Sequence, residues 1–411
     1  MNNRLQEGIY FDVGTKPGKF FGLLFLRANH KFNSRRIGTD LAKIWEMYKN
    51  LRNGRVRDLG KHRVPAGDLK LALGFGLRCF ELDKIKLPSP VEFIEYGSFH
   101  SPAADEPILT GSGLKYGKDI SHLKEAEDFV IQATADTQLA VYRTVIETWK
   151  FIQDELLDEE FNEPSITLVN FYSGFQREDY RSWLDFHDGI SNMKSGNERL
   201  SAITIQNISQ EEYGWAKNGT YMAFLRIVID LTVWRNLTRP QQEIIVGRDK
   251  LTGCPIKEID ENGNPVILEG CPAPGTVDIT QKENAKFCEI SMFLEKRLRQ
   301  SHVARVRHSG NDFSEDSDSL RIFRQGYEFL ESISTPPYFR TGLNFVSFQN
   351  NPKRLHNILV GRAWLGRTNF GGDPDNPIGK ENDLITVHSA GFYYVPPFIE
   401  DEPFPGSRIL M

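Results

Sequence analysis

Three residues in this sequence carry side chains that could do chemistry together if the fold brought them close. His302 follows an amphipathic stretch at 292–298 and precedes Val303 and Val306, so its imidazole could project from the end of an element into an apolar cavity. A neutral imidazole is a common metal ligand and a common general acid or base. A structural histidine is the more frequent outcome of such a pattern, and both interpretations stay open at this point.

Asp188 and Arg324 are the other two candidates. Asp188 precedes Gly189, a residue that permits close approach of the backbone to a flat ligand, although a plain Asp-Gly turn is the alternative. Arg324 lies in LRIFRQGYEF, whose apolar residues would bury its stem and leave a permanent cation at a cavity wall. An ordinary salt bridge is the alternative there. A carboxylate can take and return a proton, and a fixed cation can stabilise developing negative charge.

Short strands and amphipathic helices must position these side chains. Strand character is predicted for 19–28, 69–77, 129–133, 164–171, 219–231, 341–349 and 391–395. Helical patterns are predicted for 39–51, 137–157, 239–247 and 352–364. The second helix has apolar residues at helical spacing and a cap at Asp136 or Thr137; the apolar residues are Tyr142, Val145, Ile146, Trp149 and Ile152. Because strands and helices do not alternate strictly, an α+β arrangement is favoured over a doubly wound sheet.

Length and local composition predict two domains. The chain has 411 residues, and a single core usually stops growing at roughly 250 to 300 residues. We expect an N-terminal domain over 1–172 and a C-terminal domain over 201–411. The polar stretch 173–200 between them, which contains WLDFHDGISN, is expected to be a linker.

Charge and composition exclude some classes of function. A net charge of -5 argues against a nucleic-acid partner, which requires a basic surface. No secretory signal and no apolar run of roughly 20 residues is visible, so we expect a soluble, cytoplasmic protein without a membrane segment. The four cysteines are predicted to be free thiols; they are Cys79, Cys254, Cys271 and Cys288.

Several blocks of the sequence, in order, resemble the dye-decolorising peroxidase family. The resemblance rests on DGISN from Asp188, GTYMAFLRIVIDL followed by Trp234 and GRDKLTG, SHVARVR around His302, FRQGYEF around Arg324, GLNFVSFQ from Gly342, and AGFYYVPP from Ala390. It covers the chain from about Asn170 to the end, with weaker similarity in FFGLLFL, LALGFG and DFVIQATAD of the first half.

The resemblance implies a fold, a cofactor and partners. The implied fold has two ferredoxin-like halves of the dimeric α+β barrel type, with antiparallel sheets and peripheral helices. The implied cofactor is haem b, held mainly by the second half. The implied partners are hydrogen peroxide and a bulky organic reductant such as a dye or a phenolic compound, and self-association into a homo-oligomer is also implied.

Carried over residue by residue, the resemblance assigns His302 as the iron ligand, Asp188 as the acid-base group on the opposite side of the haem, and Arg324 as its partner there. It assigns further cofactor contacts to Gly189, Ile190, Arg305, Leu343 and Phe345. Asp383 matches a carboxylate that accepts a hydrogen bond from the ligand imidazole, which would make that imidazole more electron-rich.

Two positions depart from the family pattern. Asp185 stands where the motif before Asp188 normally opens with glycine, and a second carboxylate there could modulate Asp188 if it faced the haem. Ala304 stands where an arginine often follows the ligand histidine, so Arg305 is the candidate for a haem propionate. The substitution at Asp185 leaves one alternative open, a haem-binding storage, delivery or sensing protein with vestigial peroxidase activity. A ferredoxin-like interaction module without cofactor is a third interpretation.

Overall fold

The first half of the chain forms a four-stranded antiparallel sheet with two helices. A computed structural model describes residues 4–11, 18–90, 92, 98–100, 107–110, 115–116, 127–190, 192–193, 196–206, 208, 211–267, 298, 301–303, 322–355 and 384–411. The elements of this half are β1 (Phe20–Ala28), α1 (Ser34–Arg52), β2 (Lys70–Phe75), β6 (Phe129–Ala135), α3 (Gln138–Glu155) and β9 (Ile166–Phe175). The strand order is β9-β1-β6-β2, which is the order fourth, first, third, second of a ferredoxin-like fold.

The second half repeats this order with four later strands. These are β10 (Thr220–Ile229), β13 (Phe323–Ser332), β14 (Phe339–Gln349) and β15 (Ile385–Val395). β15 pairs with β10, β10 with β14, and β14 with β13, all antiparallel. The α+β fold of two ferredoxin-like halves is therefore confirmed. Strand β9 continues to Phe175, three residues past residue 172, where the first domain is expected to end. The division into domains stays a prediction.

The two halves join into one closed ring of eight strands. Glu328 of β13 pairs with Phe175 of β9 at one junction. Tyr394 of β15 pairs with Phe75 of β2 at the other. A buried cluster takes side chains from strands of both halves, so it fills the inside of the ring; its members include Phe21, Phe25, Val130, Phe224, Phe323, Tyr327, Phe348 and Tyr393. Closure also removes sheet edges that would otherwise remain unpaired.

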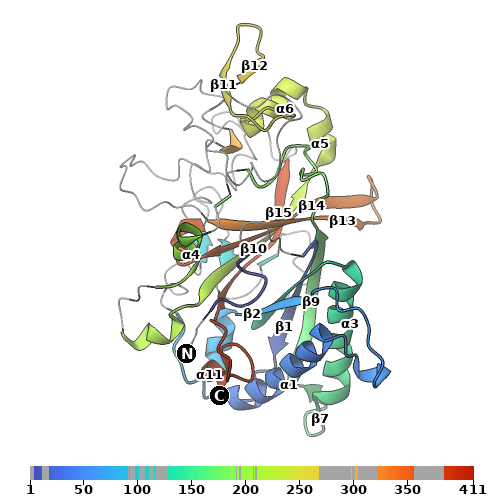
Figure 1. Ribbon diagram of the computed structural model, residues 1–411, viewed down its shortest axis with the longest axis vertical. Coiled ribbons are helices and arrows are strands. Elements are labelled where there is room, and N and C mark those ends of the chain that lie inside the picture. Colours follow the sequence, from blue (N-terminus) through green and yellow to red (C-terminus); the bar gives the residue numbers. More distant parts are fainter. Residues whose placement is uncertain are drawn as a thin grey trace.

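Smaller elements surround this barrel. They are η1 (Arg57–Leu59), η2 (Leu77–Glu81), β3 (Ser98–His100), β4 (Pro107–Thr110), β5 (Lys115–Tyr116), β7 (Leu157–Asp158), β8 (Glu163–Pro164), α4 (Asn197–Ile203), η4 (Glu211–Ala216), α5 (Leu231–Arg235), α6 (Arg239–Val246), β11 (Ile256–Ile259), β12 (Pro265–Ile267) and α11 (Ser407–Leu410). In Figure 1, α5, α6 and the β11–β12 hairpin lie at one end of the molecule, and α1, α11 and both chain ends lie at the other. Of the expected helix at 352–364, residues 353–355 are helical and 356–364 lie outside the described residues.

Local sequence accounts for where the helices begin and end. The Thr137 side chain accepts from the Ala140 N–H at the start of α3, as one of the two caps expected from the sequence. Helix α6 opens with a capping box between Thr238 and Gln241. It ends at Gly247, whose φ of 86° is a left-handed conformation that favours glycine.

Helix α3 buries a different face from the one its apolar spacing indicates. Val145 and Ile152 are buried, but Tyr142, Ile146 and Trp149 are exposed. The buried face includes Val141, Thr144 and Thr148 instead, because Thr148 hydrogen-bonds Tyr48 of α1 and Val141 packs over Gly22 of β1. Periodicity therefore predicted the helix correctly and misassigned part of its packing.

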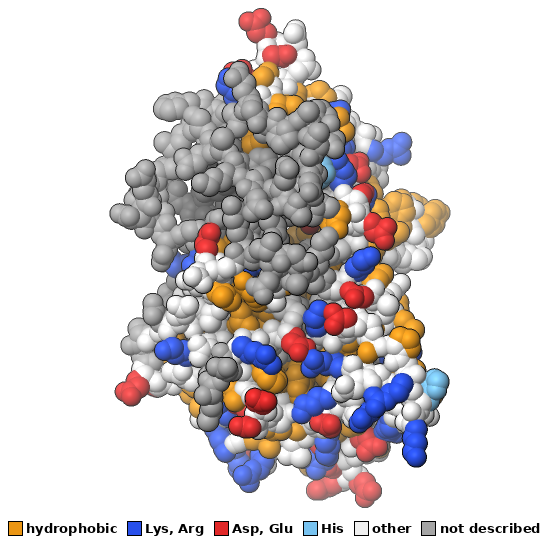
Figure 2. All heavy atoms as spheres, in the orientation of Figure 1, with side chains coloured by type: hydrophobic (Ala, Val, Ile, Leu, Met, Phe, Trp, Pro, Cys, Tyr) orange, Lys and Arg blue, Asp and Glu red, His pale blue; other side chains and the backbone are white. Residues whose placement is uncertain are grey.

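The surface carries both signs of charge. Figure 2 shows basic and acidic side chains interspersed over the part of the molecule formed by α1 and α3. Arg57 pairs with Asp154 at 2.8 Å, and Lys150 pairs with Asp58 at 2.7 Å. Among the described residues, no helix has both the length and the hydropathy to cross a membrane.

The close approach of β10 and β14 at Gly342 gives a test of the barrel. A Cβ at this position would overlap the carbonyl oxygen of Ile227 and lie 2.9 Å from Cε1 of Phe329. We expect Gly342→Ala to lower the free energy of unfolding by about 3 kcal/mol, because backbone cannot move aside as a side chain can. Urea unfolding measures this. Gly214→Ala is the control, since a Cβ there meets nothing within 4 Å; an equal effect of the two substitutions would contradict the register.

Candidate functional site

Strand β13 carries the candidate site on one of its two faces. Side chains alternate along a strand, so Arg324, Gly326 and Glu328 point to one face. Phe323 and Tyr327 point to the other face and belong to the barrel interior. The face with Arg324 is therefore the outer face of the barrel.

Leu343 and Phe345 of β14 extend this outer face. Leu343 is opposite Glu328 in register, and Phe345 is opposite Gly326. Both side chains are only partly buried although they are apolar. They give the site an apolar surface beside an arginine, as is common where a flat organic ligand binds.

A loop that carries Asp188 docks along β13. We call residues 179–190 and 192–193 the Asp188 loop. At one end, Asn192 Nδ2 donates to the carbonyl oxygen of Arg324 at 2.8 Å, and Asn192 Oδ1 accepts from the Arg324 N–H at 3.2 Å. At the other end, the Trp183 indole N–H donates to the carbonyl oxygen of Phe329 at 3.1 Å. Arg324 Nη2 also donates to the carbonyl oxygen of Ile190 at 3.0 Å.

Turns inside this loop direct Asp188 toward β13. The Asp188 N–H donates to the carbonyl oxygen of Tyr180 at 2.9 Å. Gly189 follows with a φ of 74°, and a Cβ there would meet nothing within 4 Å. Asp188 Oδ2 lies 3.3 Å from the point that a Cβ on Gly326 would occupy, and Leu343 Cδ1 lies 3.1 Å from the same point. The fold therefore brings the side chains of Asp188 and Leu343 together over Gly326, two residues along the outer face from Arg324.

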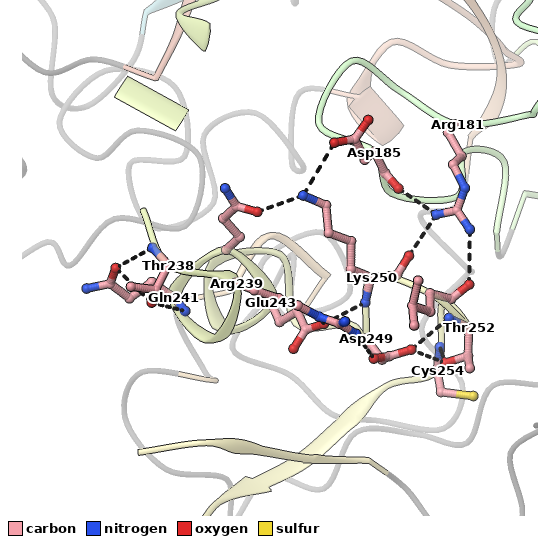
Figure 3. Close-up of polar contacts among 12 residues, drawn as sticks. Arg181, Asp185, Thr238, Arg239, Gln241, Glu243, Asp249, Lys250, Thr252 and Cys254 are labelled. Atoms are coloured by element: carbon pink, nitrogen blue, oxygen red, sulfur yellow. Dashed lines mark hydrogen bonds and ion pairs between the residues drawn. The ribbon is translucent and has the colours of Figure 1, made fainter. Parts of the chain in front are cut away.

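Asp185 lies on the same loop but forms a contact elsewhere. Its φ of 65° is left-handed, which explains why glycine suits this position and why aspartate, one of the residues that tolerates such a φ, can replace it. Its side chain is 62% exposed, and Oδ2 lies 3.5 Å from Lys250 Nζ. Figure 3 shows the carboxylate directed at this lysine. A role of Asp185 as modulator of Asp188 stays a prediction.

The segment 247–254 lies between the Asp188 loop and the turn that carries His302. A Cβ on Gly247 would lie 2.5 Å from Oγ of Ser301. At the other end of the segment, Gly253 has a φ of 76°, and a Cβ there would overlap Cδ1 of Ile190. Hydrogen bonds within the segment, among them Thr252 Oγ1 to Asp249 Oδ1 at 2.6 Å, hold its shape (Figure 3).

His302 lies on a short helical turn with Val303. The imidazole is partly exposed, and its Nδ1 atom is buried. Arg305 and Asp383, the other two residues assigned to this side, lie outside the described residues. One imidazole, two partly buried apolar side chains and a glycine with open space around it, Gly189, form a set that fits a haem.

Glu328 is a second carboxyl group at the site, and the sequence analysis did not identify it. It is 5% exposed, and its Oε2 has no hydrogen-bond partner in the described part of the chain. Burial, followed by the negative charge of Asp188, raises the pKa of Glu328 to about 9, and the nearby Arg177 offsets this only in part. The carboxyl group is therefore neutral at pH 7. Side chains two residues apart share one face of a strand, so treating residues 324, 326 and 328 as part of a strand would have placed Glu328 beside Arg324.

Fold and site together define a duplicated α+β barrel protein with an acid and an arginine on the outer face of its second half. The family model described as "Dyp-type peroxidase, C-terminal" matches residues 179–400, more than half of the chain. The chain belongs to this family of DyP-type peroxidases.

Relatives and solved structures agree with this family. The chain is 24% identical over 225 residues to proteins named deferrochelatase from Escherichia coli K12 and Shigella flexneri, covering 54% of this chain and 47% of each relative. It thus matches about half the length of these curated relatives. A DyP-type peroxidase from Cellulomonas bogoriensis matches 98% of this chain and 97% of its own with a TM-score of 0.66 and 16% identity. DypB from Rhodococcus jostii, solved as a variant in complex with haem, covers 96% of each chain with a TM-score of 0.56 and 15% identity.

The raised pKa of Glu328 predicts a stability that depends on pH. The folded chain holds a proton on Glu328 up to about pH 9, whereas the unfolded chain releases it near the usual value of 4.5. Folding therefore binds a proton in this interval, and the free energy of unfolding falls as pH rises through it and levels off above pH 9. We expect Glu328→Gln to match the parent at pH 5 and to exceed its stability by on the order of 2–4 kcal/mol at pH 8.

Urea unfolding at pH 5 and pH 8 measures this difference. Glu258→Gln is the control, because Glu258 is exposed on β11 and its replacement is expected to have the same small effect at both pH values. A difference between Glu328→Gln and the parent that does not change with pH would contradict a buried neutral acid.

Proposed function

We propose that this chain is a haem b peroxidase that reduces hydrogen peroxide and oxidises bulky organic reductants such as dyes or phenolics. The observation that carries this proposal is the placement of Asp188 over Gly326, beside the partly buried Leu343 and on the same face of β13 as Arg324. In balanced form, one hydrogen peroxide and two molecules of a reductant AH give two waters and two molecules of A. Each peroxide thus takes up two electrons and two protons.

His302 would hold the haem iron through its imidazole. When bound, the haem iron supplies the site at which peroxide binds and is cleaved, and it receives electrons from the reductant. Gly189, Ile190, Leu343 and Phe345 would contact the macrocycle. The roles of Arg305 at a propionate and of Asp383 as hydrogen-bond acceptor for the ligand imidazole stay predictions.

Asp188 and Arg324 would handle the proton and the charge. A carboxylate oxygen of Asp188 would take a proton from the bound peroxide and return it to the departing oxygen, as one group acting first as base and then as acid. The Arg324 guanidinium, charged at every relevant pH, would stabilise negative charge on that oxygen. The guanidinium donates to the Ile190 carbonyl oxygen, and the Asn192 side chain forms two hydrogen bonds with the Arg324 backbone. These contacts support a fixed position for the guanidinium.

The alternative function, haem binding without peroxidase turnover, rests on the second carboxylate at Asp185. Because that carboxylate is exposed and pairs with Lys250, it gives this alternative less support. Steady-state dye oxidation by the haem-loaded protein separates the two functions, because a storage, delivery or sensing protein would bind haem without turning over. An interaction module without cofactor would instead be isolated colourless when haem is supplied.

Loss of the ligand imidazole should release the haem. We expect His302→Ala to reduce the haem retained after gel filtration at least about tenfold, since the protein would contribute no iron ligand in its place. The ratio of Soret to protein absorbance measures this, and added imidazole should restore part of it. His62→Ala is the control, because His62 is exposed and distant in sequence from the site. Full haem retention by His302→Ala would overturn the assignment.

Loss of the acid or the arginine should slow the reaction with peroxide while haem stays bound. We expect Asp188→Asn to lower its bimolecular rate constant by roughly 10²–10⁴-fold. Arg324→Leu should lower it by on the order of a hundredfold. Stopped-flow absorbance of the haem-loaded variants measures both. Asp185→Asn, a carboxylate-to-amide change three residues from Asp188, is the matched control and should react like the parent.

A further inference from the structure

Two carboxyl groups approach each other over the outer face of β13. Asp188 Oδ2 lies 3.3 Å from the Cβ position of Gly326. Glu328 stands two residues further along the same face, which places its Cβ only about 7 Å from that point. The Asp188 loop is fastened to β13 on both sides of Glu328, by Asn192 at Arg324 and by Trp183 at Phe329. Glu328 is therefore enclosed between the strand and the loop that carries Asp188.

The surroundings of Glu328 supply little positive charge to balance a second anion. Across the sheet it is opposite Phe175 of β9 and Leu343 of β14, which are both uncharged. The charged groups that act on it are Asp188, Asp179 and Arg177. Arg177 is already paired with Asp179, with Nε 3.0 Å and Nη2 2.5 Å from the two carboxylate oxygens. No ion pair joins Glu328 to a cation within the described residues.

We propose that Glu328 and Asp188 form a carboxyl pair that carries one negative charge, with the proton on Glu328, and that Glu328 is a positioning residue for the reaction with peroxide. Its neutral form leaves Asp188 as the base of the pair. Two carboxyl groups with different environments commonly divide in this way, the more buried one holding the proton. The kinetic part of this inference rests on the proposed peroxidase function, and the charge state of the pair does not.

The pair sets an alkaline limit on the reaction. When Glu328 loses its proton, two negative charges face each other, and Arg177, the cation that acts on Glu328, is already paired with Asp179. Repulsion between the two carboxylates then favours either protonation of Asp188 or movement of Asp188 away from β13. Either change removes Asp188 as the base. The burial of the Glu328 carboxyl group thus determines the pH at which the rate falls, and the exposed carboxylate of Asp185 does not. The reaction with peroxide should lose up to about tenfold per pH unit above this transition, as one ionisation requires.

Infrared difference spectroscopy of the ferric haem-loaded protein tests the charge state directly. A protonated carboxyl group has a C=O stretch separate from the bands of a carboxylate. We expect this band at pH 7 in the parent and not in Glu328→Gln, and we expect it to titrate in alkali. In Asp188→Asn the titration of the Glu328 band should move to lower pH by about 1 unit or more, because the like charge is gone. Asp185→Asn should leave the band unmoved.

The pH profile of the reaction with peroxide tests the consequence. The alkaline decline should coincide with loss of the Glu328 band in the parent and should be absent from Glu328→Gln. A missing band at pH 7, an unmoved titration in Asp188→Asn, or a decline retained in Glu328→Gln would overturn the proposal. If Glu328→Gln does not fold, the Asp188→Asn titration still decides. A parent that shows the band but does not react with peroxide would overturn the proposed function and leave the pair standing.

Discussion

The register of β13 against β14 determines which side chains share the candidate site. A shift of one residue would turn Arg324 and Glu328 into the barrel and bring Phe323 and Tyr327 out of it, because side chains alternate. The interior opposes this shift: Tyr327 stacks on Phe21 of β1 with ring centroids 4.6 Å apart, across the boundary between the two halves. Aromatic packing inside the barrel therefore holds the acid, the arginine and the glycine of the outer face in their places.

The closure of the barrel explains why an acid at position 328 is so well enclosed. Glu328 is the residue at which β13 meets β9, and the Asp188 loop covers the same junction. Burying an ionised carboxylate at such a place would cost far more than burying a neutral one, so the fold selects the protonated form. An apolar residue would suit the junction better on stability grounds. Acids with strongly perturbed pKa values cluster at functional sites.

Much of the fold could be predicted from the sequence, because β1, β2, β6, β9, β10, β14 and the helices α1, α3 and α6 have strong periodic signals. Strand β13 was missed as a strand. Its outer positions are occupied by the candidate-site residues Arg324, Gly326 and Glu328. Because these are not apolar, the segment looks like an apolar run interrupted by polar residues and not like a strand. Glu328 was missed for the same reason. The contact of Asp185 with Lys250 could not be predicted, because it depends on how a loop folds against a segment about sixty residues further on.

The segment 247–254 ties the two sides of the proposed haem site to each other. Gly247 adjoins Ser301 beside His302, and Gly253 adjoins Ile190, whose carbonyl oxygen accepts from Arg324. Both glycines have left-handed φ values, so the backbone path between them requires residues without a Cβ. A Cβ at Gly247 would crowd Ser301 beside His302, and a Cβ at Gly253 would crowd the side chain of Ile190. The spacing between His302, the proposed iron ligand, and Arg324 thus depends on this short segment as well as on the barrel, which carries the arginine.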